Sequence, residues 1–206
     1  MKAVPADDRE RTEPLEQASA LVELRVDFIE AERLGDGAAG RLGLTFLPGK
    51  HGASDRYPGL VYERDLDADL AALRRQGVSY LLLLIDDREL ARWGDPEIAG
   101  RAGRVGIRVE RHPLADGSPP ASAPDMAGLL ERLRDARMSG DVAVACMGGV
   151  GRTGTVAACA LVEAGLNPAD AIAEVRQLRH PGAVETNAQR DFVSAYARWR
   201  TRKDRA

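Results

Sequence analysis

Residues 142–154 read VAVACMGGVGRTG, and the fold prediction rests on this stretch. Residues 142–146 form a short apolar run that is typical of a buried strand, and the glycine-rich residues 148–151 are typical of a tight turn. Residues 153–163 then have the pattern of a helix. The stretch therefore predicts a strand, a tight loop and a helix in direct succession.

The same alternation of strands and helices extends over most of the chain. The other predicted strands are residues 22–28, 43–47, 78–85 and 105–109, and the other predicted helices are residues 65–76, 86–93, 96–103, 125–138, 168–178 and 186–200. This order indicates an α/β fold with one central, mainly parallel sheet of about 4–5 strands flanked by helices. We expect a single domain over residues 19–203, after a flexible polar tail over residues 1–18.

The composition argues against several kinds of partner. The 206 residues carry a net charge of −3 with no cluster of Lys and Arg, so nucleic acid is not expected as a partner. No apolar segment is as long as a membrane span.

The two cysteines, Cys146 and Cys159, do not suggest a disulfide framework, which favours a reducing, cytoplasmic location. The strong preference for arginine over lysine indicates a GC-rich, bacterial coding sequence.

Cys146 and Arg152 bracket five residues, and their surroundings point to an anion site. In a chain so rich in arginine the spacing alone is weak, and a buried cysteine is usually a small apolar side chain. The glycines, however, let successive backbone N–H groups turn inward, and the following helix presents its N-terminus to the same place. The planar guanidinium of Arg152 can bind two phosphate oxygens. We therefore interpret the segment as a phosphate site rather than a purely structural turn.

The same positive field favours the thiolate of Cys146, which would place a nucleophile beneath a bound phosphate. Transfer of the phosphoryl group to sulfur requires an acid for the leaving oxygen. Asp116 is the best candidate, because it lies in a predicted loop where a side chain can reach over a pocket. The alternative is that Asp116 and Gly117 only form a turn. The hydroxyl of Thr153 can donate a hydrogen bond to the sulfur when the cysteine leaves.

Taken together, these motifs resemble the cysteine-dependent tyrosine and dual-specificity phosphatases. More narrowly, they are similar to the kinase-associated phosphatase family, the cyclin-dependent kinase inhibitor 3 type. The stretches that carry the resemblance include GLTFLPG at residues 43–49, HPLADGSP at residues 112–119, CMGGVGRTG at residues 146–154 and GAVETNAQ at residues 182–189. The resemblance implies a mainly parallel sheet with the cysteine loop at the carboxyl end of a strand. It also implies a phosphorylated protein or peptide as the substrate.

The resemblance implies a role for individual residues as well. Cys146 matches the nucleophile, Arg152 the phosphate clamp, Asp116 the general acid and Thr153 the hydroxyl that assists breakdown of the intermediate. The loop whose backbone binds the phosphate corresponds to Met147, Gly148, Gly149, Val150 and Gly151. Gln189 is a weaker match to the stretch in which related enzymes position water. No metal or other cofactor is implied.

Ala145 is the main departure from the family pattern, because a His usually precedes the cysteine and helps to organise the loop and ionise the thiol. We therefore expect weakened chemistry rather than none. The leading hypothesis is a protein phosphatase that acts on phosphotyrosine, with phosphoserine and phosphothreonine left open. A phosphate-binding module with little turnover and an enzyme for a non-protein phosphate are the alternatives.

Three aromatic residues near the predicted site are interpreted as packing or rim residues rather than as a phosphotyrosine cage. They are Tyr57, Tyr62 and Trp93. Cys159 occupies an apolar position on the predicted helix after the loop, and we expect a buried, unreactive thiol there. The sequence predicts no particular oligomeric state.

Overall fold

Strand β7 (Asp141–Cys146) occupies the middle of a five-stranded sheet whose order is β1-β2-β7-β5-β6. The structure is a computed structural model that describes residues 22–55 and 58–203; the predicted tail, residues 1–18, and Tyr57 lie outside these ranges. Its strands are β1 (Asp27–Ile29), β2 (Leu42–Phe46), β5 (Val78–Leu83), β6 (Arg108–Arg111) and β7. Strands β2, β7, β5 and β6 run parallel, and β1 pairs antiparallel with β2. The predicted α/β fold with a mainly parallel sheet is confirmed.

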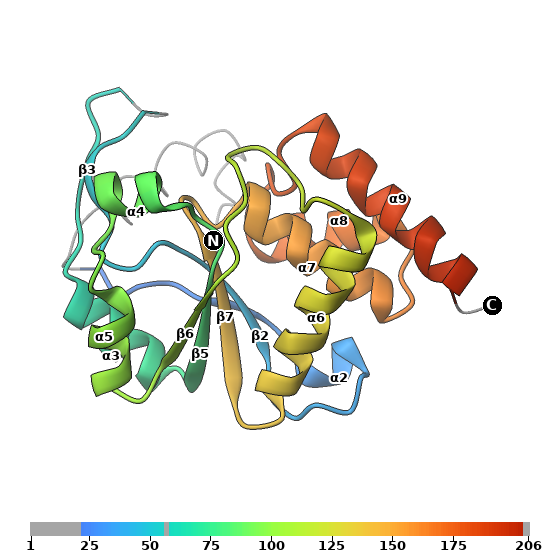
Figure 1. Cartoon of the computed structure of the whole chain (residues 1–206), viewed down its shortest axis with the longest axis horizontal. Helices are drawn as coiled ribbons and strands as arrows, with labels where there is room; N and C mark the ends of the chain where they lie inside the picture. Colours follow the sequence, from blue (N-terminus) through green and yellow to red (C-terminus); the bar gives the residue numbers. More distant parts are fainter. Residues whose placement is uncertain (1–21, 56–57, 204–206) are drawn as a thin grey trace, which may run out of the picture.

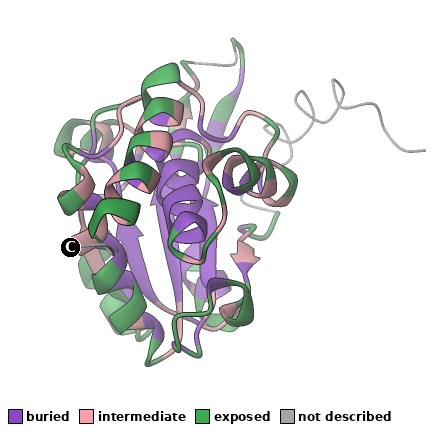
Figure 2. Cartoon of the chain, turned by 90° about the vertical axis from the view of Figure 1, so that its right-hand side faces the viewer, coloured by how far each residue is buried: buried purple, intermediate pink, exposed green. Residues whose placement is uncertain are grey.

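Helices cover both faces of this sheet (Figure 1). On one side lie α3 (Leu66–Arg75) and α5 (Ile98–Arg104); on the other lie α6 (Ala123–Arg137), α7 (Gly151–Glu163), α8 (Pro168–Leu178) and α9 (Asn187–Lys203). Because both faces are covered, the central strands β5 and β7 carry continuous apolar runs and are almost completely buried. Figure 2 shows this buried sheet with a buried helix against it, in agreement with α7, which is buried from Gly151 to Val162.

Local signals in the sequence explain where the helices begin. Asp65 caps α3 by accepting a hydrogen bond from the N–H of Ala68, and Ser122 caps α6 in the same way through the N–H of Asp125. Helix α4 (Asp87–Trp93) begins with a capping box in which Asp86 and Glu89 satisfy each other's backbone N–H groups. This capping box places Glu89 at the carboxyl end of β5.

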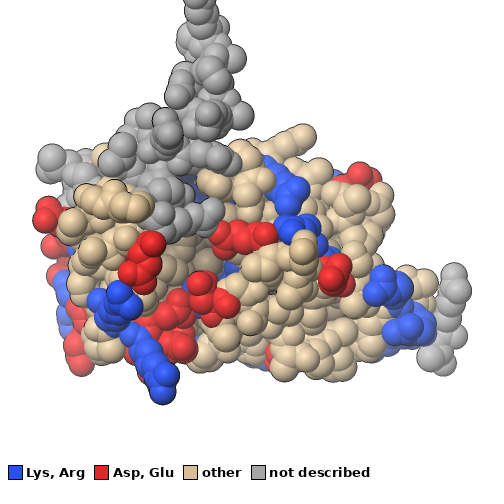
Figure 3. Space-filling view, turned by 90° about the horizontal axis from the view of Figure 1, so that it is seen from above, with Lys and Arg blue, Asp and Glu red and all other residues tan. Residues whose placement is uncertain are grey.

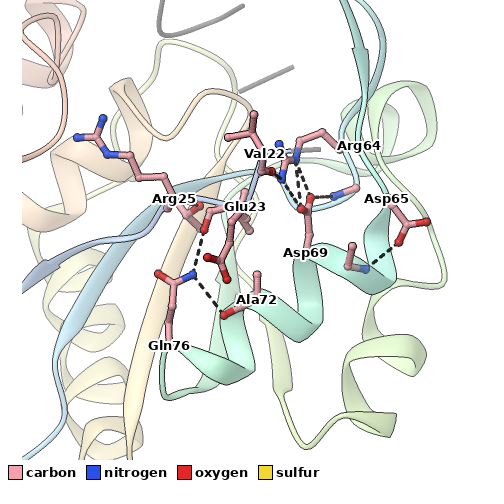
Figure 4. Close-up of polar contacts among 12 residues, drawn as sticks. Val22, Glu23, Arg25, Arg64, Asp65, Asp69, Ala72 and Gln76 are labelled. Carbon is pink, nitrogen blue, oxygen red and sulfur yellow. Dashed lines mark hydrogen bonds and ion pairs between the residues drawn. The ribbon is translucent and has the colours of Figure 1, made fainter. Parts of the chain in front are cut away.

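The predicted strand over residues 22–28 is wrong for its first part, because β1 covers only Asp27–Ile29. Side chains, and not the backbone of a neighbouring strand, donate to the carbonyl groups of three preceding residues. The Val22 carbonyl accepts from Arg64, the Leu24 carbonyl from Gln76 and the Arg25 carbonyl from Thr45. Figure 4 shows two of these contacts, those of Val22 and Gln76. The alternating pattern reflected half-burial without strand pairing.

The predicted strand over residues 105–109 is displaced, since β6 covers Arg108–Arg111. Gly106 has a φ of +77°, and the N–H of Ile107 donates back to the carbonyl of Ala102. The chain therefore still turns at these positions before it becomes extended. The predictions did not include the short helix α2 (Ala31–Leu34) or the separate hairpin of β3 (His51–Ala53) and β4 (Val61–Glu63).

A buried ion pair fixes the chain where it leaves β2 (Figure 4). The side chains of Arg64 and Asp69 are 1% and 3% exposed and bind each other through several hydrogen bonds. Asp69 also accepts from the N–H of Gly49, and the N–H of Arg64 donates to the carbonyl of Lys50. The segment that contains Gly49 and Lys50 is thus held from both sides.

Candidate active site

The predicted cysteine loop lies at the carboxyl end of the central strand, as the sequence indicated. Cys146 is the last residue of β7, and α7 begins at Gly151, so the N-terminus of a buried helix faces the loop between them. Gly149 has a φ of +66°, and a side chain there would meet the carbonyl oxygen of Thr45 at 2.5 Å. The loop therefore requires glycine at this position.

Arg152 lies on the first turn of α7 with its side chain 1% exposed. Its guanidinium donates to both carboxylate oxygens of Glu89, at 2.6 and 2.7 Å, and to the carbonyl of Leu114 at 3.0 Å. Burial lowers the pKa of Arg152, but the hydrogen bonds that it donates to Glu89 and the negative charges of Cys146, Glu89 and Asp116 raise that pKa by more. The net effect is a raised pKa, so the guanidinium remains charged.

Asp116 is brought to the same place, although it is far from the loop in sequence. Its carboxylate lies 3.0 Å from the Nη2 atom of Arg152, and its side chain is 82% exposed. The next residue, Gly117, has a φ of +69°, and its carbonyl accepts a hydrogen bond from the hydroxyl of Thr186. The turn expected at Asp116-Gly117 and the position beside the site thus occur together.

Thr153 and Gln189 lie behind the loop and not at its surface. Both are fully buried, and within the described residues the Thr153 hydroxyl and the Gln189 Nε2 atom have no hydrogen-bond partner. The Oε1 atom of Gln189 accepts from the N–H of Thr186. Glu185, rather than Gln189, lines the cavity. Glu185 follows Val184, a β-branched residue in the strained left-handed region at φ 58°.

Cys146, Arg152, Asp116 and Glu185 line one cavity of about 240 Å³ above the carboxyl ends of β2, β7 and β5. Phe46, Tyr62 and Trp93 form apolar walls, so Tyr62 and Trp93, interpreted above as packing or rim residues, line the cavity itself. Figure 3 views this end of the sheet from above and shows acidic and basic side chains interspersed on the surface. The cavity therefore combines aromatic walls with a mixed charge at its mouth.

Sequence reasoning missed two cations in this cavity, Lys50 and Arg179. Arg179 donates to the carbonyl of Gly149 at 3.1 Å and pairs with Asp27 at 2.8 Å, so it fastens the loop to β1. Lys50 is 7% exposed, and its Nζ atom lies 3.6 Å from the centre of the Tyr62 ring. Burial lowers the pKa of Lys50 to about 8, against the opposing influence of Cys146 and Asp55. A Lys after the quoted motif GLTFLPG was the available signal for Lys50.

Two further observations bear on the expected chemistry. Ala145 is fully buried, and its carbonyl accepts from the N–H of Leu84, so the position before the cysteine contributes no charge. Cys159 is fully buried on α7, as predicted, and burial raises the pKa of its thiol well above the ordinary value. Within residues 22–55 and 58–203, no group of three or more His, Cys, Asp or Glu side chains is placed to hold a metal ion.

The cavity brings together a nucleophile, a charged guanidinium, a helix N-terminus and an exposed acid. This combination suits the transfer of a phosphoryl group. The family comparison agrees: the family described as "PTP-SAK: Swiss Army Knife protein, DSP-PTPase phosphatase domain" matches residues 69–195. The chain therefore belongs to the DSP-PTPase phosphatase domain family.

Individual relatives narrow the comparison. The chain is 28% identical to cyclin-dependent kinase inhibitor 3 from Sus scrofa over 161 residues, which cover 75% of this chain and 71% of the relative. The same values hold for the Homo sapiens protein. The crystal structure of kinase-associated phosphatase with its catalytic-site cysteine substituted by serine has a TM-score of 0.74 and 24% identity, covering 86% of this chain and 96% of that one. The active form of Tk-PTP has a TM-score of 0.61 and 27% identity, covering 77% and 92%. The predicted resemblance is confirmed.

Proposed function

We propose that this chain hydrolyses phosphomonoesters through a phosphocysteine intermediate, and the observation that carries the proposal is the placement of Cys146, Arg152 and Asp116 at one cavity. Arg152 and the loop N–H groups of residues 147–151 bind the phosphate. The Cys146 sulfur attacks phosphorus, so that an S–P bond forms and the P–O bond to the leaving group breaks. Asp116 gives its proton to the leaving oxygen.

The second half of the reaction returns the enzyme to its starting state. Water attacks phosphorus, the S–P bond breaks, and the carboxylate of Asp116 takes the proton of the water. The buried hydroxyl of Thr153, which has no partner within the described part of the chain, is available to stabilise the departing thiolate. Gln189 remains our proposal for a residue that positions the water; its Nε2 atom faces Gly151 from behind the loop.

Phosphorylated proteins or peptides are the proposed substrates, and phosphotyrosine is the preferred residue. The aromatic walls of Phe46, Tyr62 and Trp93 suit a phenyl ring, and a kinase-associated phosphatase is among the similar structures. We also propose that residues 19–203 act as one phosphatase domain in the cytoplasm. Two cysteines without a disulfide support that compartment. No helix in the described ranges has both the length and the apolar character needed to cross a membrane.

The test is hydrolysis of an aryl phosphate and of phosphotyrosine, phosphoserine and phosphothreonine peptides. Cys146→Ser should remove turnover, and Cys159→Ser is the matched control, because that thiol is buried away from the cavity. Asp116→Asn should lower turnover by about 10²–10³-fold while vanadate still binds. Wild-type turnover in Cys146→Ser would overturn the covalent mechanism, and activity only on small metabolites or lipid phosphates would overturn the substrate class.

A phosphate-binding module with little turnover is the second candidate, and Ala145 is the observation that favours it. Vanadate and phosphopeptide binding measured beside activity separates the two. Tight binding without turnover from acidic to neutral pH would establish the binding module.

A further inference from the structure

The cations of the cavity differ in whether a carboxylate already neutralises them. Arg152 is held by two carboxylates, those of Glu89 and Asp116, and Arg179 is paired with Asp27. In both cases the positive charge is matched or exceeded by negative charge within ion-pair distance. Neither arginine therefore leaves the surroundings of Cys146 with a net positive charge.

Lys50 is the exception among these three cations. Within the described residues the Lys50 ammonium forms no ion pair, and it lies over the face of the Tyr62 ring. Buried charges in proteins are ordinarily paired, because removal from water is costly. A buried ammonium that lines the same cavity as the Cys146 sulfur therefore indicates an anion that is not a side-chain carboxylate.

The backbone that carries Lys50 is built to hold it in place. Asp69 accepts from the N–H of Gly49, the residue before it, and Arg64 donates its N–H to the carbonyl of Lys50. Gly49 has a φ of +68°, and a side chain there would meet the Cβ atom of Leu66 at 2.7 Å. The backbone at Lys50 is thus held by contacts to Arg64 and Asp69, the buried pair shown in Figure 4, and the ammonium lies over the Tyr62 ring.

We propose that Lys50 is the counter-ion of the Cys146 thiolate in this chain and takes the electrostatic part of the His that Ala145 replaces. The inference rests on the proposed function, since it assigns a positioning residue to the same nucleophile. Other charged or titratable groups face Lys50 from the surrounding elements. They are Cys146 on β7, Tyr62 on β4, Asp55 between β3 and β4, Glu89 on α4, Asp116 between β6 and α6, Arg152 on α7, Arg179 and His180 directly after α8, and Glu185 before α9.

The sum of these charges explains why Lys50 is needed. Glu89 and Asp116 together outweigh the single positive charge of Arg152, whereas the charge of Asp55 is paired with Arg92 and that of Asp27 with Arg179. Without Lys50, a thiolate at Cys146 and a phosphate dianion would both enter a cavity with an excess of negative charge. With Lys50, the cavity offers each of them one positive charge that no carboxylate neutralises.

The experiment measures how fast iodoacetamide alkylates Cys146 between pH 4.5 and pH 9 in wild type, Lys50→Met, Lys50→Gln and Lys50→Arg. Lys203→Met is the matched control, because Lys203 also lies over an aromatic ring but at the end of α9. Cys146→Ala gives the background from Cys159. Both neutral variants should be alkylated about tenfold more slowly at pH 6, with the midpoint of the alkylation profile about one pH unit higher. Lys50→Arg and Lys203→Met should follow wild type.

Profiles of Lys50→Met and Lys50→Gln that coincide with Lys203→Met would overturn the inference. So would a Lys50→Arg profile that moves together with the neutral variants, because side-chain shape and not charge would then be responsible. Alkylation requires no turnover. A failure here therefore leaves the proposed hydrolysis intact, and an absence of turnover leaves the alkylation profile interpretable.

Discussion

Two of the arginine–carboxylate pairs with a buried arginine, Arg64–Asp69 and Arg152–Glu89, differ in whether the arginine has a side open to a ligand. Arg64 and Asp69 are closed on all sides, since backbone groups of Val22 and Gly49 complete their hydrogen bonds. Arg152 is held by Glu89 on one side, whereas its other side meets only the exposed Asp116. The closed pair fixes the shape of the chain, and the open pair keeps a charge available to a ligand. Similar chemistry thus serves structure in one place and binding in the other.

The largest expected effect separates these two roles at Arg152. Arg152→Lys keeps a positive charge but loses the planar fork, so kcat/KM for an aryl phosphate should fall by about 10³–10⁴-fold, roughly 4–5 kcal/mol. The free energy of unfolding from urea denaturation should change little. A variant that unfolds readily but retains turnover would reverse the comparison.

Asp69→Asn is the opposite experiment on the closed pair. It leaves Arg64 charged and buried, so the free energy of unfolding should fall by about 3 kcal/mol. Glu23→Gln is the control, since the Glu23–Arg75 pair has side chains that are 58% and 63% exposed, and the change there should be under about 0.5 kcal/mol. Equal losses in the two variants would show that burial of the Arg64–Asp69 pair is unimportant.

Glu89→Gln tests how far the catalytic role of Arg152 depends on its ion pair with Glu89. The amide can accept only one of the two guanidinium hydrogen bonds and carries no charge, so Arg152 should be less well oriented. We expect kcat to fall by about thirtyfold, roughly 2 kcal/mol, with a smaller change in KM. Steady-state kinetics with an aryl phosphate check this, and a change confined to KM would assign Glu89 to substrate binding alone.

Lys50 adjoins both regions, since its backbone is held beside the Arg64–Asp69 pair and its side chain lines the Arg152 cavity. Lys50→Met should have the smallest effect, a rise in the free energy of unfolding. The pKa of Lys50 is lowered from 10.5 to about 8 in the folded protein, so between these values the unfolded chain binds more protons. Wild-type stability should therefore rise between pH 8 and pH 10.5, and the buried charge should lower the free energy of unfolding at pH 7. Thermal unfolding at both pH values should show Lys50→Met to be more stable than wild type at pH 7 and lacking this rise. Lower stability at pH 7 would contradict the burial cost.

The sequence was sufficient for the features that depend on local pattern. The apolar run before Cys146, the glycines after it and the helix beginning at Gly151 are neighbours in the chain, so their arrangement could be predicted. The loop position made Asp116 a candidate acid, and the family resemblance decided between that role and a simple turn. The contact of Asp116 with Arg152 is made by the return of the chain from β6.

Lys50 and Arg179 could not be assigned in this way, because their positions depend on contacts between distant elements. The backbone at Lys50 is held by Arg64, which follows β4, and by Asp69 in α3. Arg179 reaches the cysteine loop from the end of α8. The first predicted strand failed for a related reason. The carbonyl groups of Val22, Leu24 and Arg25 accept hydrogen bonds from side chains of distant residues, which no alternation of apolar residues reveals.

The contact between Asp116 and Arg152 has a consequence for the order of events. A phosphate and Asp116 compete for the same side of the guanidinium, so each incoming substrate releases the Asp116 carboxylate, which takes up a proton from the phosphate monoanion or from solvent before it protonates the leaving oxygen. Because Asp116 is 82% exposed, the exchange costs at most about 1 kcal/mol. Binding of the phosphate and release of Asp116 from Arg152 are therefore one step. The side chain that contacts the guanidinium in the empty cavity becomes the proton donor once a phosphate is bound.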